Sequence, residues 1–380
     1  MDRPYDQRHR AGRLRIAMLV PPWYELPPPG YGGVEQMAAA LVDALVAKGH
    51  EVTVIGAGVR SGTAGRFVST VAEPQHLRLG EGLPELLHVA RANQLLAEGD
   101  FDVVHDHTSS GLLTAGTRPM PTVATVHNCP KGEHGDLLAA LGETEVSLVA
   151  ISAAQRRTRP ELPWSAVIHN GLSTEGLANT PPDPRPATQR PVLWLARFNP
   201  DKGPDLAIEA CRAAGLPLVL AGKCTEPGER SYLSEVIAPM LGPDTELVLN
   251  ADRRRCQALI RSARCLILPI RWEEPFGMVM VEAMAEGTPV VALRRGAVPE
   301  VIRAGVTGLI CDEPEQLPAA LEQVTSIDSI TCISHVQNSF SAELMASRYE
   351  QVYRRAVRRS LARETAPAYA PVGQRTLHGF

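Results

Sequence analysis

Short apolar runs alternate with amphipathic stretches in the first part of the chain. Residues 14–20 form a mainly apolar run that ends at Pro21 and Pro22, which is typical of a buried strand stopped by proline. Apolar residues then recur at helical spacing from Val34 to Leu45. A further helix is expected at 83–96, and further strands at 52–55, 101–105, 122–127, 148–152 and 166–169. Strands that alternate with helices predict parallel βαβ units with right-handed crossovers.

The alternation stops at residues 173–191 and then begins again. This interval contains a proline-rich run, which lacks backbone donors and stiffens the chain, so we predict an interdomain linker. Beyond it, strands are expected at 192–196, 218–221, 246–249, 266–269 and 289–293, and helices at 205–214, 232–241, 253–263 and 277–285. The pattern predicts an α/β fold with two Rossmann-like domains, residues 14–172 and 192–341, that face each other across a deep interdomain cleft. A helix at 342–363 is expected to pack back toward the N-terminal domain, and residues 364–380 form a tail.

Composition narrows the class of protein. The chain has 38 Lys and Arg against 42 Asp and Glu, and this net charge of −4 with only 21% charged residues argues against a dedicated nucleic-acid binder. Hydrophobic residues make up 44% of the chain, which is enough for two cores. The seven cysteines form no CxxC or CxxH pair, so neither a disulfide framework nor a zinc site is expected. No apolar run approaches the ~20 residues that span a bilayer, and no export signal is recognised, so we expect a soluble cytoplasmic protein.

The most informative segment is 272–291, where an expected strand leads through a loop into an expected helix. Pro275 disfavours the helical region for the residue before it, so Glu274 should lie in the loop. Glu282 lies further along the helix. The amides that a helix start leaves without an intrahelical partner favour an anion. They are those of Phe276, Gly277 and Met278. Two glutamates at this spacing also occur by chance, and one near a helix start can simply stabilise the helix dipole.

Two further segments offer groups for a phosphate. Arg197 ends an expected strand and Lys202 precedes an expected helix, so both should reach the cleft, where arginine can bind two phosphate oxygens and lysine acts as a point charge. Gly32 and Gly33 follow the first strand and let backbone amides approach a phosphate or sugar closely. Tyr31 in the same loop is a candidate platform for a sugar ring. A lysine before a helix, or a pair of glycines, can also be an ordinary surface turn.

Two histidines, His107 and His127, follow expected strands and should face the cleft. A single histidine at a strand end is often structural, so that interpretation stays open. His105 and His107 lie on one face of a strand, but no third metal ligand occurs at a sequence spacing typical of a metal site, so no metal is expected.

The segment Glu-Pro-Phe-Gly, the seven residues between Glu274 and Glu282, and the following Ala-Met-Ala-x-Gly-Thr-Pro-Val-Val together resemble the signature of the retaining GT-B glycosyltransferases of family 4. The resemblance covers about residues 14–360. It implies that Glu274 holds hydroxyls of the donor sugar and that Glu282 holds the ribose. It also implies the GT-B fold, in which the C-terminal domain binds most of the nucleotide sugar.

The same resemblance implies roles for the other candidates. Arg197 and Lys202 match the family's Arg-x4-Lys-Gly and would neutralise the donor diphosphate, while His127 would lie near the donor sugar and the reaction centre. The chain departs from the family at Ala196, where glycine is frequent, and at Ser173, where aspartate is common. The expected catalytic residues are Glu274, His127, Arg197 and Lys202, and Tyr31 and His107 are candidates on the acceptor side.

The implied activity is retaining, metal-independent transfer of a sugar from a nucleotide-diphosphate donor, with a UDP-sugar favoured, to a hydroxyl of a small molecule, glycan or lipid. No cofactor is expected besides the donor, and no nucleic-acid partner. Two alternatives stay open: a sugar-nucleotide epimerase of the same fold, and a non-catalytic two-domain ligand-binding protein. Four arginines on the last helix, at 354, 355, 358 and 359, would allow contact with an anionic membrane, although a solvated helix end explains them more simply.

Overall fold

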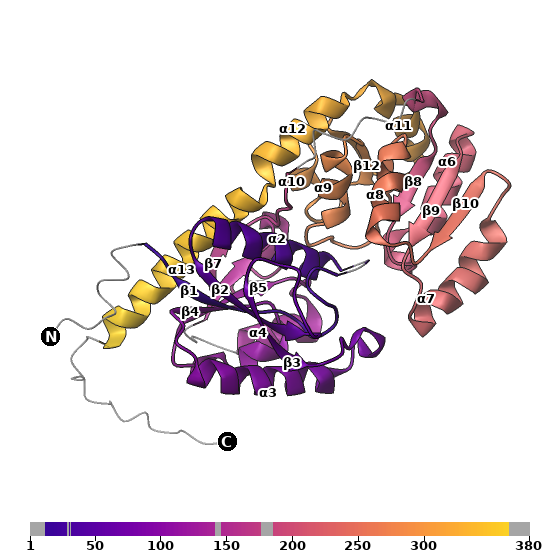
Figure 1. Cartoon of the computed structure of the whole chain (residues 1–380). Helices are drawn as coiled ribbons and strands as arrows, with labels where there is room; N and C mark the ends of the chain where they lie inside the picture. Colours follow the sequence, from indigo (N-terminus) through magenta and orange to yellow (C-terminus); the bar gives the residue numbers. More distant parts are fainter. Residues whose placement is uncertain (1–11, 29, 31, 141–145, 176–184, 365–380) are drawn as a thin grey trace, which may run out of the picture.

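The computed structural model describes residues 12–28, 30, 32–140, 146–175 and 185–364. These residues form two β-sheets that lie one beyond the other along the molecule, each packed against helices (Figure 1). The first sheet has seven strands in the order β3-β2-β1-β4-β5-β6-β7, and the second has six in the order β10-β9-β8-β11-β12-β13. The predicted α/β class with two Rossmann-like halves is therefore confirmed.

The N-terminal half contains the seven-stranded sheet, in which every neighbouring pair is parallel. Its strands are β1 Arg15–Leu19, β2 Glu51–Ala57, β3 Arg66–Val71, β4 Val103–Asp106, β5 Thr122–Val126, β6 Ser147–Ala150 and β7 Trp164–Val167. Its helices are α2 Gly33–Ala47, α3 Gly82–Glu98, α4 Gly132–Ala140 and α5 Ala153–Thr158. Because β1 lies between β2 and β4, the strand order changes direction at β1, and the loop after it lies at the usual ligand-binding edge.

The C-terminal half repeats this plan with six parallel strands. Its strands are β8 Val192–Leu195, β9 Leu218–Gly222, β10 Thr245–Leu249, β11 Leu266–Leu268, β12 Val290–Leu293 and β13 Gly308–Cys311. Its helices are α6 Pro204–Ala214, α7 Pro227–Tyr232, α8 Arg253–Ser262, α9 Met278–Ala285, α10 Val298–Val301, α11 Leu317–Gln323 and α12 Ser329–Ser339. The central strand is β8, which lies between β9 and β11.

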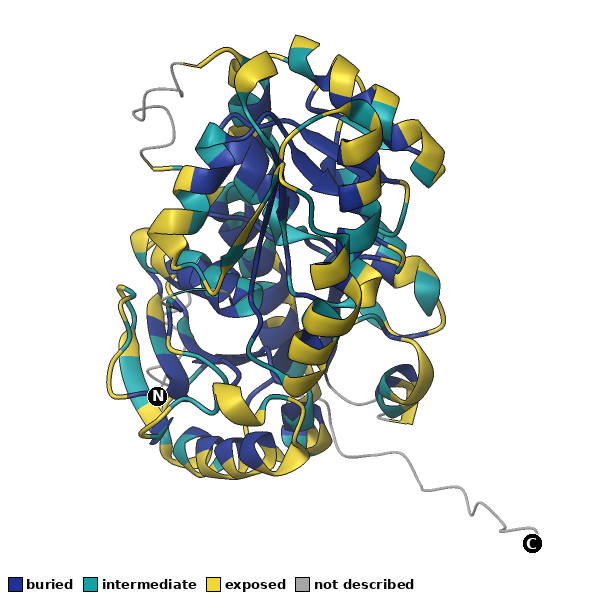
Figure 2. Cartoon of the chain, turned by 90° about the vertical axis from the view of Figure 1, so that its right-hand side faces the viewer, coloured by how far each residue is buried: buried dark blue, intermediate teal, exposed yellow. Residues whose placement is uncertain are grey.

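Both faces of the inner strands of each sheet are buried, and the exposed residues lie mainly on the outer helices and on edge strands such as β10 (Figure 2). Along β1, Ile16 and Met18 pack into the core that α2 covers, whereas Ala17 and Leu19 pack on the other face with α3. A strand that is covered on both faces needs apolar residues at successive positions. For this reason continuous apolar runs marked these strands in the sequence.

The last helix, α13 Ala342–Glu364, returns to the N-terminal half and lies along it (Figure 1). Tyr349 and Tyr353 are fully buried there, in the same core as β1 and α2. The preceding helix α12 packs instead against α9 of the second half. The last helix therefore completes the core of the first half.

Several elements were not predicted. The strand β3 lies at a sheet edge and is partly exposed, so it carries polar residues and does not form an apolar run in the sequence. The helix α5 has only six residues, which are too few for a helical periodicity to be recognised. The helix expected at 232–241 begins earlier, as α7, and continues in a π-helical turn, Leu233–Ile237, and a 3-10 turn, Ala238–Met240. Pro239 lacks an N–H group and cannot take part in regular α-helical hydrogen bonding there.

Candidate active site

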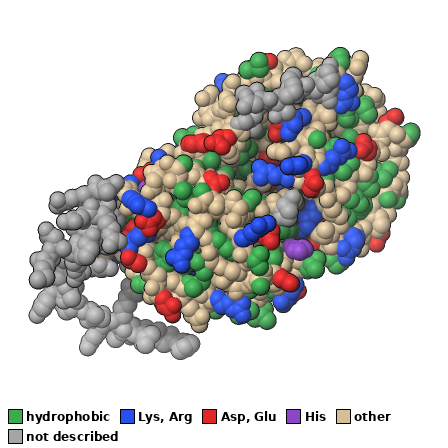
Figure 3. Space-filling model, viewed as in Figure 1, with side chains coloured by type: hydrophobic (Ala, Val, Ile, Leu, Met, Phe, Trp, Pro, Cys, Tyr) green, Lys and Arg blue, Asp and Glu red, His purple; other side chains and the backbone are tan. Residues whose placement is uncertain are grey.

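A cleft of about 780 Å³ opens where the two halves of the chain meet. The loop after β1 and the start of α2 line one wall, and the ends of β8 and β9 with parts of α8 and α9 line the other. Lys and Arg side chains gather at this junction on the face seen in Figure 3. The cleft thus lies at the carboxyl ends of parallel strands, where open α/β sheets bind ligands.

Lys202 and Glu274, which were both expected to bind the donor, meet in this cleft. The Lys202 ammonium donates to Oε2 of Glu274 at 2.6 Å, and Nε1 of Trp272 donates to the same oxygen at 3.0 Å. The ammonium also lies 4.5 Å from the centre of the Trp272 ring, a cation–π distance. Oε1 of Glu274 accepts no hydrogen bond from the described residues, so it is available to a ligand.

Helix α9 begins beside this pair. Its N-cap, Gly277, has a φ of 84°, a left-handed conformation that favours glycine, and no side chain caps the helix. Gly277 and Met278 line the cleft, whereas Phe276 is buried in the core of the second half. The uncapped helix start gives this end of the cleft a positive potential that suits a phosphate group.

Glu282 lies further along α9 and also lines the cleft. Burial raises the pKa of its carboxyl, and the positive charge of Arg253, at the start of α8, opposes that rise. Arg253 also contacts the other half of the chain: with the Gln36 amide oxygen turned toward it, two guanidinium nitrogens donate to that oxygen at 2.6 and 3.0 Å. Arg253 therefore connects the expected ribose-binding carboxylate with α2 across the cleft.

Arg197 differs from expectation, because it is not among the residues that line the cleft. Its guanidinium lies 3.7 Å from Glu226 and 4.0 Å from Glu229, and these two carboxylates hold it near the start of α7. Lys223, at the end of β9, lines the cleft and was missed by the sequence analysis because it belongs to no recognisable motif. Its ammonium donates to the Tyr24 hydroxyl of the opposite half at 3.0 Å and to Glu226 at 3.2 Å.

The glycine loop forms the N-terminal wall of the cleft. Gly32 and Gly33 both line it, and a Cβ atom at position 33 would lie 3.8 Å from the side chain of Met278 on α9. The loop therefore faces the start of α9 directly. Tyr31, the expected acceptor-side residue, lies outside the described residues.

Glu35 lies in the first turn of α2, behind the glycine loop, and is only 4% exposed. Burial raises the pKa of its carboxyl to about 7 from 4.5, while a backbone hydrogen bond and the positive charge of Lys223 act in the opposite direction. Between these pH values the folded chain holds a proton that the unfolded chain has released. The free energy of unfolding should therefore fall as the pH rises through this range.

Glu35→Gln is expected to stabilise the protein above pH 7, by up to about 3 kcal/mol, and to change little near pH 4.5. Urea unfolding of both proteins at several pH values measures this difference. Glu133→Gln, in the exposed first turn of α4, is the matched control and should show no such pH dependence. A stabilisation by Glu35→Gln that stayed constant with pH would contradict the raised pKa.

His107 and His127 follow β4 and β5 and contact each other, although neither is among the residues that line the cleft. Nδ1 of His107 lies 2.9 Å from Nε2 of His127. Burial lowers the pKa of His127 to about 4 and places the pKa of His107 well below its ordinary value. Both rings are therefore neutral at neutral pH.

The backbone amides of Gly296 and Ala297 donate hydrogen bonds to the loop that carries Glu274. The Gly296 amide donates to Oε2 of Glu273 at 2.7 Å, and the Ala297 amide donates to the Glu274 carbonyl at 2.9 Å. Gly296 has a φ of 54°, and a Cβ atom there would lie 2.2 Å from the Glu274 carbonyl oxygen. The position of Glu274 thus depends on a glycine far from it in the sequence.

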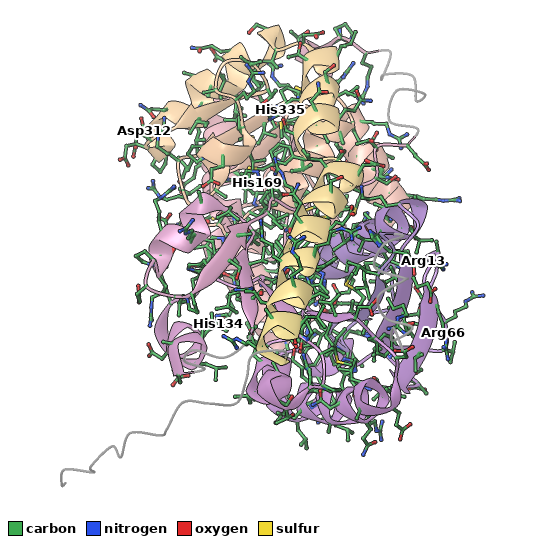
Figure 4. All side chains as sticks on the ribbon, turned by 90° about the vertical axis from the view of Figure 1, so that its left-hand side faces the viewer. Arg13, Arg66, His134, His169, Asp312 and His335 are labelled. Atoms are coloured by element: carbon green, nitrogen blue, oxygen red, sulfur yellow. The ribbon has the colours of Figure 1, made fainter. Side chains whose placement is uncertain are left out.

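Glu300 on α10 connects the two halves beside the cleft. Its carboxylate accepts hydrogen bonds from the amides of Ala153 and Ala154, at the start of α5, at 2.8 and 2.6 Å. Nε2 of His169 lies 3.2 Å from the same carboxylate, and Figure 4 shows His169 where the two halves meet. Burial raises the pKa of Glu300, but the contacts with His169 and the two amides outweigh it, so the pKa is lowered.

The arginines of α13 lie apart from this cleft. Arg355, Arg358 and Arg359 line a separate hollow of about 450 Å³ with Ser165, while Arg354 pairs with Glu350 of its own helix. No helix in the described part of the chain is long and apolar enough to cross a membrane. The described residues also include no group of three or more His, Cys, Asp and Glu side chains that could hold a metal ion.

Two family models match the chain, one in each half. The model described as Glycosyltransferase Family 4 matches residues 31–176, and the model described as Glycosyl transferases group 1 matches residues 179–331. Together they span both walls of the cleft.

Individual proteins are similar over nearly the same length. The phosphatidyl-myo-inositol mannosyltransferase of Mycolicibacterium smegmatis is 28% identical over 346 residues, covering 83% of this chain and 86% of that protein. The structure of AviGT4, a glycosyltransferase involved in Avilamycin A biosynthesis, has a TM-score of 0.70 at 24% identity and covers 91% of this chain and 98% of its own. HepE of Anabaena, in complex with UDP and glucose, has a TM-score of 0.68 at 18% identity and covers 89% and 99%.

Proposed function

The chain belongs to family 4 of the GT-B glycosyltransferases, and from this premise we propose that it transfers a hexosyl group from a UDP-sugar to a hydroxyl acceptor, with retention of anomeric configuration and without a metal ion. The observation that carries the proposal is the meeting of Lys202, Glu274 and the uncapped start of α9 in one cleft. Lys202 and the helix amides offer positive charge to a diphosphate. The free Oε1 of Glu274 can accept a hydrogen bond from a sugar hydroxyl.

Negative charge develops on the diphosphate as its bond to C1 of the sugar breaks. In this proposal the Lys202 ammonium and the Met278 amide stabilise that charge, because preorganised donors lower a barrier most where charge develops. In the proposed reaction the acceptor oxygen bonds to C1 on the face that the diphosphate leaves. The acceptor proton passes to a diphosphate oxygen, so no side chain has to act as a base.

The choice of UDP and of a hydroxyl acceptor is supported by the comparisons. HepE, a protein of the same fold, is described in complex with UDP and glucose. The Mycolicibacterium relative is named for mannosyl transfer to phosphatidyl-myo-inositol, so lipids belong among the acceptors to be tried. Sugars and small molecules complete the candidate set.

Thermal unfolding with UDP, GDP or ADP, followed by transfer assays, tests the proposal. UDP is expected to stabilise the chain most, by about 2.7 kcal/mol at a hundredfold excess over its Kd. With the matching UDP-sugar, nucleotide release should require an acceptor, persist in EDTA and give a product with the anomeric configuration of the donor. Stabilisation by GDP or ADP alone would contradict the UDP assignment, and sugar interconversion without an acceptor would indicate an epimerase.

A further inference from the structure

His127 belongs to a chain of contacts that begins at β1. Nε2 of His107 lies 3.1 Å from the thioether sulfur of Met18, and Nδ1 of the same ring lies 2.9 Å from Nε2 of His127. The two imidazole rings are stacked with their centres 5.2 Å apart. His107 is thus held between a thioether on one side and His127 on the other.

The chemistry of the thioether decides where the protons lie. A methionine sulfur accepts a hydrogen bond weakly and has no hydrogen to donate, so the contact with Met18 is favourable only when Nε2 of His107 carries its proton. A neutral imidazole carries one N–H, so Nδ1 of His107 must then accept. The only partner at that atom is Nε2 of His127 within the described residues, and it must therefore donate.

Neighbouring groups do not compete for His107. Its ring packs against that of His105 with the centres 4.0 Å apart, but the nitrogens of His105 have their own partners. Nε2 of His105 lies 2.8 Å from the Thr125 hydroxyl, and Nδ1 lies 2.7 Å from the hydroxyl of Tyr353 on α13. His105 therefore supports the ring of His107 by packing and leaves its hydrogen bonds unchanged.

We propose that Met18 and His107 are positioning residues that fix His127 as the Nε2-protonated tautomer, so that its Nδ1 accepts a hydrogen bond from a hydroxyl of the donor sugar. Nδ1 of His127 has no hydrogen-bond partner in the described part of the chain, and the side chain is only half-buried. The inference rests on the proposed function, because it places the sugar of the donor beyond the residues that line the cleft, at the carboxyl end of β5, where His127 lies.

This arrangement gives the site a defined selectivity. An unprotonated ring nitrogen binds a group that donates a hydrogen bond and gains nothing from a group that only accepts one. A deoxy donor and a deoxyfluoro donor, altered at the hydroxyl that meets His127, should therefore lose rate to a similar extent. If His127 donated instead, the fluorinated donor would keep more of the rate than the deoxy donor.

The tautomer can be measured without any substrate. In the full-length protein labelled with 15N-histidine, the NMR resonances of His127, assigned by their loss in His127→Gln, should show a protonated Nε2 and an unprotonated Nδ1. Met18→Leu keeps a side chain of similar volume but removes the acceptor, so a mixture of tautomers is expected. A wild-type spectrum with the proton on Nδ1 of His127 would overturn the proposal, as would an unchanged spectrum in Met18→Leu.

Kinetics test the positioning role. His107→Leu is expected to lower kcat with the UDP-sugar on the order of ten- to a hundredfold, by analogy with the loss of an outer-shell partner of a metal-ligating histidine, with the donor KM little changed. His107→Asn can still accept from His127 and should recover part of that loss. Equal kcat values for His107→Leu and the wild type, or no recovery by asparagine, would refute the positioning role.

The two proposals can fail separately. If the protein transfers no sugar from any UDP donor, the proposed function fails while the NMR result still decides the tautomer. If transfer occurs but the proton is found on Nδ1, the proposed function stands and the inference about Met18 and His107 is wrong.

Discussion

Replacing Lys202 with alanine is expected to lower kcat about a hundred- to a thousandfold, because it removes a preorganised cation from the departing diphosphate. Glu274→Gln should also lower kcat strongly, since an amide replaces the carboxylate that Lys202 and Trp272 hold in the cleft. The measurement is the initial rate of UDP release with donor and acceptor. Both variants should keep a cooperative thermal transition, because the pair lies at the surface of the cleft, outside the apolar cores.

A charge change elsewhere on the same half provides the control. Arg254 is exposed at the start of α8 and does not line the cleft, so Arg254→Ala should leave kcat and KM close to wild type. A folded Lys202→Ala protein that kept near wild-type turnover would show that the diphosphate is neutralised by other groups. Lys223 and Arg253, which also line the cleft, would then be tested in its place.

Gly296→Ala is expected to reduce both stability and activity, because the residue lies against the backbone of the loop bearing Glu274 and donates to the side chain of Glu273. The left-handed backbone costs alanine about 1 kcal/mol. The added Cβ would lie 2.2 Å from the Glu274 carbonyl oxygen and 2.4 Å from its nitrogen, so the loop must move, at a further cost of ~1–3 kcal/mol. A displacement of about 1 Å at a reacting group can lower the rate on the order of a hundredfold.

Gly305→Ala separates the two causes. Gly305 also has a positive φ, of 74°, but a Cβ atom there would meet nothing within 4 Å. This variant should lose about 1 kcal/mol in urea unfolding and keep its activity. If Gly296→Ala behaved like Gly305→Ala in both measurements, the loop at Glu274 would not depend on contact with Gly296.

Most of the fold could be predicted because its strands are covered on both faces. The runs that became β1, β8 and β12 are apolar at nearly every position, and the helices α2 and α6 begin at Gly33 and Pro204, directly after glycine- or proline-bearing loops. The edge strand β3 gave no such signal, since half-exposed strands carry polar residues. Local pattern therefore predicted most strands, including the exposed edge strand β10, but missed β3, β13 and the helices α11 and α12.

The candidate site was predictable only as far as its motifs extend. Lys202 and Glu274 come together because each follows a strand that ends at the same edge of one sheet. Arg197 also follows a strand that ends at this edge of the sheet. Its guanidinium nevertheless lies near the carboxylates of Glu226 and Glu229 at the start of α7, and no local sequence pattern encodes that contact between segments. Lys223 was missed for the converse reason, because its place in the cleft depends on Tyr24 from the other half.

The return of α13 to the N-terminal half bears on how the protein is made. Residues such as Met345, Tyr349 and Val352 close the core that β1 and α2 begin, yet the ribosome adds them only after the whole second half. The half of the chain that is synthesised first must therefore remain with apolar surface uncovered until residues 342–364 have been synthesised. A nascent chain released before residue 342 would leave its first half unfinished, even though the missing residues are encoded after the second.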